Sequence, residues 1–365
     1  MLLVFPVILT GCGSGGIANM SENRGDHTTT LLNDGTLFVS GGRAAKATNT
    51  TELLDTVTGQ WTLKSPMSYK RYGHSQVLLN DGNVLVIGGS TNAMKDYIPE
   101  IYNPSTDTWT QIDNMQYPRR QGHTATVMGD GRVIVTGGIA EIKGTRKTIA
   151  HVEIYDPQNG SWSMTSDMSE PREMHKAILL NNNKVLVVGS KTDEQYILGS
   201  TSAELYDPET GEWSNTGNLS YPHATNFTAT KLKDGSILVS GGGARGRYLA
   251  PNITEVMEIY DPSSNEWSLT EPMTQKSWEH TANLLDDGNI LFVKSRILEI
   301  YNPETKTWTL IGEMSDSRAG DHTATLVNGK TFIIGGSNIT YDKYGGVALR
   351  DGFNSVLVYD PSVEW

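Results

Sequence analysis

The sequence has 365 residues and a formal net charge of -12. A chain of this charge, with no lysine- or arginine-rich run, repels phosphate, which excludes nucleic acid as a partner. Glycine is abundant at 38 residues and Asp-Gly pairs recur, so many short strands are favoured over long helices and an all-β fold is predicted.

A short apolar run, VFPVILTG, precedes Cys12, the only cysteine of the sequence. The run is too short to span a bilayer and is typical of the apolar part of a signal peptide. Residues 9–12, Leu-Thr-Gly-Cys, resemble the bacterial lipoprotein signal, in which the cysteine is acylated and becomes the mature N-terminus. We therefore expect residues 1–12 to be a signal segment, Cys12 to carry a lipid, and the protein to be secreted and held in the bacterial cell envelope. An unlipidated secretory signal is the alternative.

From residue 24 onward one pattern returns about every 40 to 55 residues, the spacing of propeller blades. Each copy contains a histidine, an Asp-Gly-like turn, an apolar run that usually ends in glycine, a stretch such as EIYNP, and a tryptophan. The histidine position holds His27, His74, His123, His175, Phe227, His280 and His322. The tryptophan position holds Trp61, Trp109, Trp162, Trp213, Trp267, Trp308 and Trp365.

These parts predict four antiparallel strands, A to D, in each repeat. Asp-Gly, as at residues 34–35, tolerates the positive φ of a type I′ turn, which folds strand A back as strand B. The glycine pair after strand B, as at residues 41–42, permits a close backbone approach. Proline after strand C removes an amide donor and leaves a short turn before the tryptophan of strand D. Such sheets cover both of their faces only when they are stacked.

The repeat resembles the kelch repeat, in the form common in bacterial kelch proteins and in the central domain of galactose-oxidase-like enzymes. The resemblance implies a single seven-bladed kelch-type β-propeller of four-stranded antiparallel blades over residues 13–365. The expected blades are residues 24–67, 71–115, 119–168, 172–219, 224–273, 277–314 and 318–365. Because this fold serves unrelated functions, it does not identify the chemistry.

The N-terminal residues match the end of a repeat. A methionine or leucine follows most of the tryptophans by six residues, and Met20 fits this position with no tryptophan before it. We expect residues 14–20 to complete the outer strand of the last blade and to close the ring. A strand D that continues beyond Trp365 is the alternative. Closure would put the lipid on the side of the C-to-D turns and point the D-to-A links and B-to-C loops away from the membrane.

Six histidines in one register suggest a metal site, but equivalent positions on separate blades do not converge to the roughly 2 Å distances that zinc needs. We expect each histidine to brace the start of its strand A. Galactose-oxidase-like enzymes hold copper with tyrosines and histidines and crosslink one tyrosine to a cysteine. Here Cys12 lies in the signal segment, so this centre is not expected. The sequence predicts no metal and no cofactor.

Arginines supply the candidate binding residues. Arg24, Arg71, Arg120 and Arg172 lie three residues before the repeat histidine, and Arg318 lies one place off that register. Kelch domains that capture acidic peptides line their central pocket with arginines at such positions, and guanidinium groups pair well with carboxylates. The structural alternative is pairing between blades with the glutamate of strand C, since buried charges require partners. That glutamate recurs as Glu52, Glu100, Glu153, Glu204, Glu258 and Glu299.

Arg43 and Arg245 follow the glycines after strand B, lie outside the repeat consensus, and are the better candidates for ligand binding. The long B-to-C loops 243–256 and 337–355 add Tyr248 and Tyr344. Loops rich in tyrosine and arginine are common in recognition surfaces, although they are equally explained as tolerated insertions. The fifth repeat also replaces arginine and histidine with Ala224 and Phe227, and the sixth replaces the glycine pair with Lys294-Ser295.

Together these features predict a monomeric, non-catalytic binding module. It would bind a protein, peptide or glycan through its D-to-A links and B-to-C loops and touch the membrane only through the lipid. The alternative is a sugar-modifying enzyme that resembles kelch-fold sialic acid epimerases and uses Arg, Glu and His in the central mouth. Arginines without ion-pair partners that converge on one pocket would favour the enzyme, whereas arginines tied to the repeat glutamates would favour the module.

Overall fold

The computed structural model describes residues 17–90, 98–190, 199–244, 252–277, 279–314, 318, 320–341 and 347–363. The elements of this part of the chain are all β-strands, as predicted, and it contains no helix long and apolar enough to cross a membrane. The chain divides into two compact units: residues 1–72 with 277–365, and residues 73–276.

The first unit contains three antiparallel four-stranded sheets in its described residues. One is formed by β1 (Thr28–Leu31), β2 (Leu37–Ser40), β3 (Thr51–Leu54) and β4 (Trp61–Lys64). Another is formed by β26 (Thr281–Leu284), β27 (Ile290–Lys294), β28 (Ile297–Asn302) and β29 (Thr307–Glu313). The last is formed by β30 (Gly320–Val327), β31 (Lys330–Tyr341), β32 (Val347–Gly352) and β33 (Val356–Tyr359).

The second unit contains four such sheets in its described residues. They are β5 (Ser75–Leu78), β6 (Val84–Ile87), β7 (Glu100–Asn103) and β8 (Thr108–Gln111); β10 (Thr124–Val127), β11 (Val133–Thr136), β14 (Val152–Asp156) and β15 (Ser161–Met164); β16 (Lys176–Leu179), β17 (Val185–Val188), β18 (Ala203–Asp207) and β19 (Glu212–Asn215); and β20 (Thr228–Lys231), β21 (Ile237–Ser240), β24 (Met257–Asp261) and β25 (Glu266–Leu269).

Some B-to-C loops carry extra strands. In the third repeat β12 (Ile139–Ile142) pairs with β13 (Thr145–Thr148) and with β9 (Arg119–Gln121) of the preceding link. In the fifth repeat β22 (Gly243–Ala244) pairs with β23 (Asn252–Ile253). In the seventh, β31 extends into the predicted loop 337–355 and pairs there with β32, while its first half pairs with β30 and β33.

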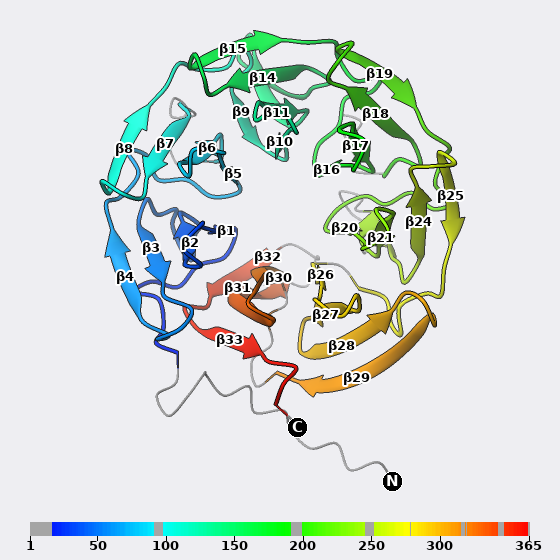
Figure 1. Ribbon diagram of the computed structural model, residues 1–365. Coiled ribbons are helices and arrows are strands. Elements are labelled where there is room, and N and C mark those ends of the chain that lie inside the picture. Colours follow the sequence, from blue (N-terminus) through cyan, green and yellow to red (C-terminus); the bar gives the residue numbers. More distant parts are fainter. Residues whose placement is uncertain are drawn as a thin grey trace. The chain divides into compact units, whose positions relative to one another are not determined.

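Neighbouring sheets of each unit lie side by side through their A strands. In the second unit β10 lies between β5 and β16, and β16 contacts β20; in the first unit β30 lies between β1 and β26. Figure 1 shows, within the second unit, the D strands β8, β15, β19 and β25 along the side opposite the A strands. The predicted four-stranded antiparallel sheets are confirmed, and each falls within one predicted repeat. The closed seven-bladed ring stays a prediction.

The core lies between neighbouring sheets and is formed mainly by the B strands. Val185 and Val187 of β17 pack toward β11 of the preceding sheet, whereas Leu186 and Val188 pack toward β21 of the following one. Successive side chains of a strand point to opposite faces, so a strand covered on both sides must be apolar throughout. This explains the uninterrupted apolar runs of the sequence.

The turns between strands A and B differ from the predicted type. At Asp34-Gly35 only the glycine has positive φ (85°), and Gly35 N–H donates to the Leu32 carbonyl (3.0 Å). This is a three-residue loop in which a left-handed glycine follows a type I turn. A two-residue loop with positive φ at both positions occurs at Asn328-Gly329 (50° and 78°). The type I′ prediction was therefore wrong for the Asp-Gly turns.

The second glycine after strand B is required by the approach of the repeat histidine. Gly42 has φ of 96°, and a Cβ there would lie 2.8 Å from the Cβ of His27. A side chain at this position would therefore clash with the start of strand A.

Two contacts recur where a strand D ends. Trp162 Nε1–H donates to the carbonyl of Asp113, two residues before the buried Met115 of the preceding repeat (2.8 Å). Met168 N–H donates to the carbonyl of Ala150 in its own repeat (3.1 Å). The tryptophan thus links its sheet to the end of strand D in the preceding repeat. The methionine fixes the end of strand D to its own repeat.

The N-terminal residues make the same contacts in the first unit. Trp61 Nε1–H donates to the carbonyl of Ala18, and Met20 N–H donates to the carbonyl of Asn354 (both 2.8 Å). The Met20 side chain is 2% exposed in a core shared with β2 and β31. Residues 17–20 form no strand, so they take the place of the end of a strand D and not of its whole length. Residues 14–16 of the predicted closing strand lie outside the described part.

Candidate functional site

The D-to-A links and B-to-C loops carry most of the predicted binding residues, and hydrogen bonds join them. In the first repeat Gly42 N–H donates to the carbonyl of Arg71 (2.8 Å), and Arg71 N–H donates to the carbonyl of Thr48 (3.0 Å). The loop that begins at Arg43 is therefore fixed beside the link that continues to Tyr72.

Five link arginines have fully buried side chains: Arg24, Arg71, Arg119, Arg172 and Arg318. Arg24 donates from Nη2 to Glu52 Oε1 (2.7 Å) and from Nη1 to the carbonyl of Gly41 (2.8 Å). Arg172 donates from Nε and Nη2 to Glu204 Oε1 (3.3 and 3.0 Å). Since these guanidinium groups are buried and donate hydrogen bonds to groups inside the protein, they are not exposed to a ligand. Burial therefore argues against the prediction that these arginines contact a ligand.

Arg318 is held differently. It donates from Nη2 to the hydroxyl of Ser355 (2.7 Å) and from Nη1 to the carbonyls of Gly335 and Ser355. Leu357 stands where the other repeats have glutamate. These three acceptors are neutral and belong to the last repeat.

The repeat arginine of the third repeat is Arg119, one residue before the predicted Arg120. Arg119 forms an ion pair with Glu153, whereas the half-buried Arg120 donates from Nε to Ser90 Oγ (2.8 Å). Arg119 lies four residues before His123, the same spacing as that between Arg318 and its histidine. The sequence register therefore misplaced this residue by one position.

The repeat glutamates hold the links as well as the arginines. Besides Arg24, Glu52 accepts the N–H of Ser21 (2.8 Å); Glu204 likewise accepts the N–H of Ser169 (2.8 Å). Each carboxylate thus fastens the link before a repeat to strand C of that repeat. The arginine and glutamate pairs lie within a repeat, so the structural alternative identified the right partner but the predicted pairing between blades was wrong.

Where arginine is missing, another nitrogen-bearing side chain lies beside the glutamate. In the fifth repeat the buried His223 lies 3.5 Å from Glu258, and in the sixth the buried Lys294 of β27 donates to Glu299 (2.7 Å). Although burial opposes it, hydrogen bonds from His223 and from the N–H groups of Ser220 and Tyr221 lower the pKa of Glu258. Sequence reasoning missed both partners of the glutamates; the retained glutamates were the available signal, because a buried carboxylate needs a partner.

The repeat histidines are structural. His175 Nε2 shares hydrogen bonds with Thr136 and with Thr124 of the preceding A strand (2.7 and 3.3 Å). Burial, together with the positive charge of the nearby repeat arginine, lowers the pKa of His27, His123 and His322 from 6.5 to about 3. These imidazoles are therefore neutral at physiological pH and brace the A strands, as predicted from the repeat.

The exception at Phe227 is matched by an exception in the neighbouring repeat. Thr124 of the third repeat contacts His175 of the fourth. The equivalent residues of the fourth and fifth repeats are Lys176 and Phe227, and Lys176 Nζ lies 5.8 Å from the centre of the Phe227 ring. A cation over an aromatic face replaces the hydroxyl and imidazole hydrogen bond. The two departures therefore contact each other.

No group of three or more His, Cys, Asp or Glu in the described residues is placed to hold a metal ion. Cysteine is likewise absent from this part of the chain. The described residues therefore do not fit the copper centre with its tyrosine and cysteine crosslink.

Arg43 differs from the buried arginines. Its side chain is 32% exposed, its Nε donates to Asp26 Oδ2 (2.7 Å), and its guanidinium lies over the Tyr72 ring, 4.0 Å from the centre. Neither Nη atom has a partner among the described residues. Lys46 on the same loop and Lys70 beside the adjoining link are exposed. An orientated guanidinium with two free nitrogens can bind a carboxylate with two parallel hydrogen bonds.

The other predicted residues cannot be placed at this site. Cys12, Arg245, Tyr248 and Tyr344 lie outside the described residues.

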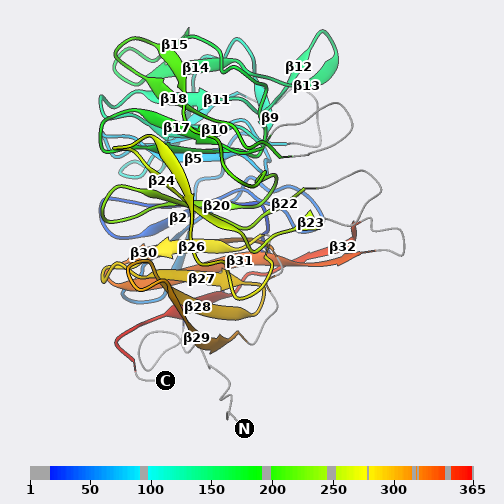
Figure 2. The ribbon, with the colours of Figure 1, turned by 90° about the vertical axis from the view of Figure 1, so that its right-hand side faces the viewer.

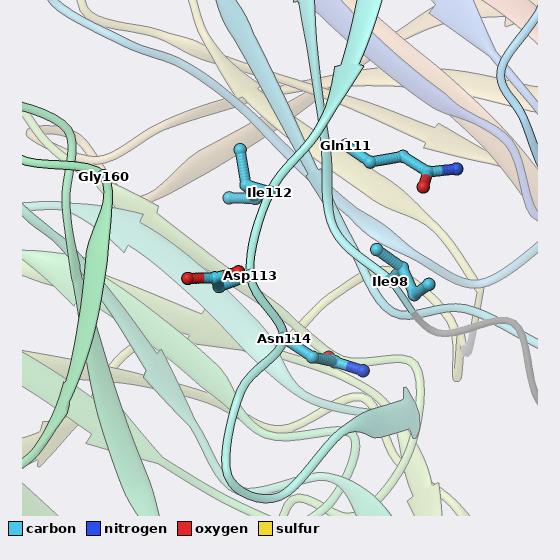
Figure 3. A pocket seen from close by; sticks show the side chains of 6 residues that line it. All are labelled: Ile98, Gln111, Ile112, Asp113, Asn114 and Gly160. Carbon is cyan, nitrogen blue, oxygen red and sulfur yellow. The ribbon is translucent and has the colours of Figure 1, made fainter.

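A groove on the second unit offers no comparable arrangement. Its volume is about 570 Å³, and it is lined by Ile98, Gln111, Ile112, Asp113, Asn114 and Gly160. Figure 3 shows Gln111 and Asn114 on one side of the chain segment and Asp113 on the other. Because its polar groups do not converge, the groove does not form an orientated binding site.

The sequence matches the KLHDC2/KLHL20/DRC7 Kelch-repeats domain family over residues 26–219. It is 25% identical over 265 residues to Kelch-like protein 25 of Xenopus tropicalis, covering 67% of this chain and 42% of that protein. It is 25% identical over 169 residues to Kelch-like protein 26 of Danio rerio, covering 46% of this chain and 26% of that protein. The chain thus spans less than half the length of these relatives.

Among solved structures, a fungal alcohol oxidase of the AA5 family in complex with copper is similar, with a TM-score of 0.70 and 18% identity. The match covers 93% of this chain and 76% of the oxidase. At this identity the likeness shows the fold alone.

Proposed function

The chain belongs to the kelch-repeat family, and from this premise we propose that it is a non-catalytic module that binds an acidic segment of a protein partner through Arg43. Kelch-repeat relatives are typically protein-interaction modules. The observation that carries the proposal is the half-exposed guanidinium of Arg43, which Asp26 and Tyr72 hold in place. The exposed Lys46 and Lys70 add positive charge on the adjoining segments.

The pairing of the buried arginines favours a binding module over a sugar-modifying enzyme. Arg24, Arg119 and Arg172 are each paired with the glutamate of their own repeat, which is the arrangement expected of a scaffold. An ion-paired, buried guanidinium is not available to a sugar substrate.

The test is capture of acidic peptides by the soluble chain that begins after Cys12. Arg43→Ala should weaken binding of the best peptide about tenfold or more, and Arg43→Lys should restore little, since lysine cannot pair in a bidentate way. Arg132→Ala is the matched control, because Arg132 is 36% exposed and pairs with Asp130 (2.6 Å) at the A-to-B turn. Equal affinities of wild type and Arg43→Ala, or an equal loss in Arg132→Ala, would refute the role of Arg43.

We also propose that Cys12 anchors the module in a bacterial envelope with its loops directed away from the membrane. Ala18 N–H donates to the carbonyl of Gly59 in the C-to-D turn of the first sheet (3.0 Å), which supports a tether at that side. Expression of the full chain in a bacterium tests the anchor: wild type should sediment with membranes and carry acyl mass, and Cys12→Ser should do neither. Membrane association that Cys12→Ser retains would contradict it.

A further inference from the structure

A small second sheet projects from the third repeat. Its strand order is β13-β12-β9, and Figure 2 shows β12 and β13 extending past β10 and β11 of the same unit. Lys143 and Gly144 form the hairpin turn with φ of 51° and 75°. Among the described residues β13 pairs with β12 alone, so β13 is an edge strand.

This hairpin is basic although the chain is acidic. Lys143, Arg146 and Lys147 are exposed, as is Glu141, so three cations and one anion give +2 on a chain of net charge -12. Glu141 lies directly opposite Arg146 in the hairpin register. The side chains of Lys143 and Lys147 form no ion pair with another residue that the structure describes.

The free edge of β13 has backbone groups to offer. Ile142 and Thr145 flank a two-residue turn, and such a flanking pair exchanges its hydrogen bonds across the hairpin. Because the pairs alternate along an antiparallel ladder, the N–H and C=O of Arg146 and Thr148 point away from β12. Those groups are the ones that an added strand would meet.

We propose that β13 binds an extended acidic segment of a partner protein as an additional strand. The backbone of the segment would pair with Arg146 and Thr148, and its alternate carboxylates would meet Arg146 on one face and Lys147 on the other. This surface is separate from Arg43, and the inference stands without the function proposed above.

The charge of the edge determines the kind of occupant. Cations on an edge strand discourage two copies of the same strand from pairing, because each would bring the same charge. An acidic segment turns that repulsion into attraction. The hairpin therefore favours a different, acidic chain over a second copy of this one.

The experiment uses the soluble chain and a fluorescent octapeptide of alternating glutamate and valine, with binding measured by anisotropy at low salt. Arg146→Glu/Lys147→Glu should weaken binding about tenfold or more, since both contacts become repulsive. Lys233→Glu/Lys306→Glu reverses two charges in exposed turns and should leave the affinity unchanged. Thr148→Pro keeps every charge and removes one outward N–H, so it should weaken binding roughly threefold to tenfold.

Four results would overturn the proposal. The first is the absence of binding to the wild type, and the second is an equal loss in the two charge-reversal variants. The third is full affinity of Thr148→Pro for the peptide, which would mean that the hairpin binds the peptide by charge alone and not as an added strand. Binding to vesicles with anionic lipid in preference to the peptide would assign the hairpin to a membrane surface and also refute the proposal. The same series is repeated in the Arg43→Ala background, where the Arg43 site is removed, so a loss caused there by Arg146→Glu/Lys147→Glu reports on the hairpin alone.

Discussion

Arg172 and Arg43 are chemically identical, but the fold uses them in opposite ways. Arg172 is fully buried and gives its donors to Glu204, Ser202 and the carbonyl of Gly189. Arg43 is 32% exposed and gives one donor to Asp26. In a repeat protein a residue that follows the repeat is usually needed by the packing of every sheet, whereas one that departs from it is free for another role. The contrast separates scaffold from candidate site.

The largest expected effect is acid destabilisation, which would sharpen the contrast by showing how deeply the repeat residues are buried. The pKa of His27, His123 and His322 is lowered to about 3, and that of His175 falls well below its ordinary value. The unfolded chain therefore takes up protons below pH 6.5 while the folded chain does not, so stability falls as pH falls from 6.5 toward 3. Each such histidine should remove roughly 1 kcal/mol of unfolding free energy per pH unit below 6.

Urea unfolding at pH 7, 6 and 5 checks this effect. His322→Gln is the control variant, because it removes one titrating imidazole and should reduce the slope of stability against pH. Glu258 acts in the same direction at lower pH: its pKa is lowered in the folded chain, so below the ordinary pKa of glutamate the unfolded chain takes up a proton that the folded chain does not. A flat dependence between pH 7 and 5 would show that the imidazoles are accessible in the folded state.

The next effect compares the two arginines directly. Arg172→Ala should lower the unfolding free energy by about 3–5 kcal/mol, because Glu204 would remain buried without its cation. Arg43→Ala should cost less than about 1 kcal/mol, the usual value of an exposed pair. Urea midpoints at pH 7 give both values. Similar losses of unfolding free energy in Arg172→Ala and Arg43→Ala would show that the two arginines do not differ in structural role.

The smallest effect tests whether the paired departures in the fourth and fifth repeats are structural. Lys176→Thr and Phe227→His should each destabilise the protein, and the double variant should recover stability because it rebuilds the pair seen at Thr124 and His175. The expected coupling in a double-mutant cycle is about 1 kcal/mol. Additive losses would mean that Lys176 and Phe227 are not coupled and leave the two departures free for a binding role.

Local patterns allowed most of the fold to be predicted. Strand order and turn positions follow from residues close together in the sequence, because glycine, proline and apolar runs act locally. The turn geometry was missed because Asp-Gly serves both two-residue and three-residue loops, and their difference depends on the pairing of the flanking strands.

The candidate site was harder to predict, because its decisive property is exposure. Arg24, Arg71 and Arg43 all looked suitable, yet Arg24 and Arg71 are fully buried and Arg43 is partly exposed, and the replacements His223 and Lys294 come from different elements. A partner for a buried carboxylate is chosen in space, so no fixed spacing reveals it. Only the reasoning that placed Arg43 outside the repeat consensus gave a usable guide.

The hydrogen bonds between Met20 and Asn354 join residues 334 positions apart. A ribosome completes almost the whole chain before Met20 can meet Asn354, so the segment lacks its partner from the last repeat throughout synthesis, although Ala18 can contact Gly59 and Trp61 early. Loop closure over such a separation is slow. We expect docking of this segment to be among the last events of folding, and until then the apolar surface of β2 and β31 is open to chaperones and proteases.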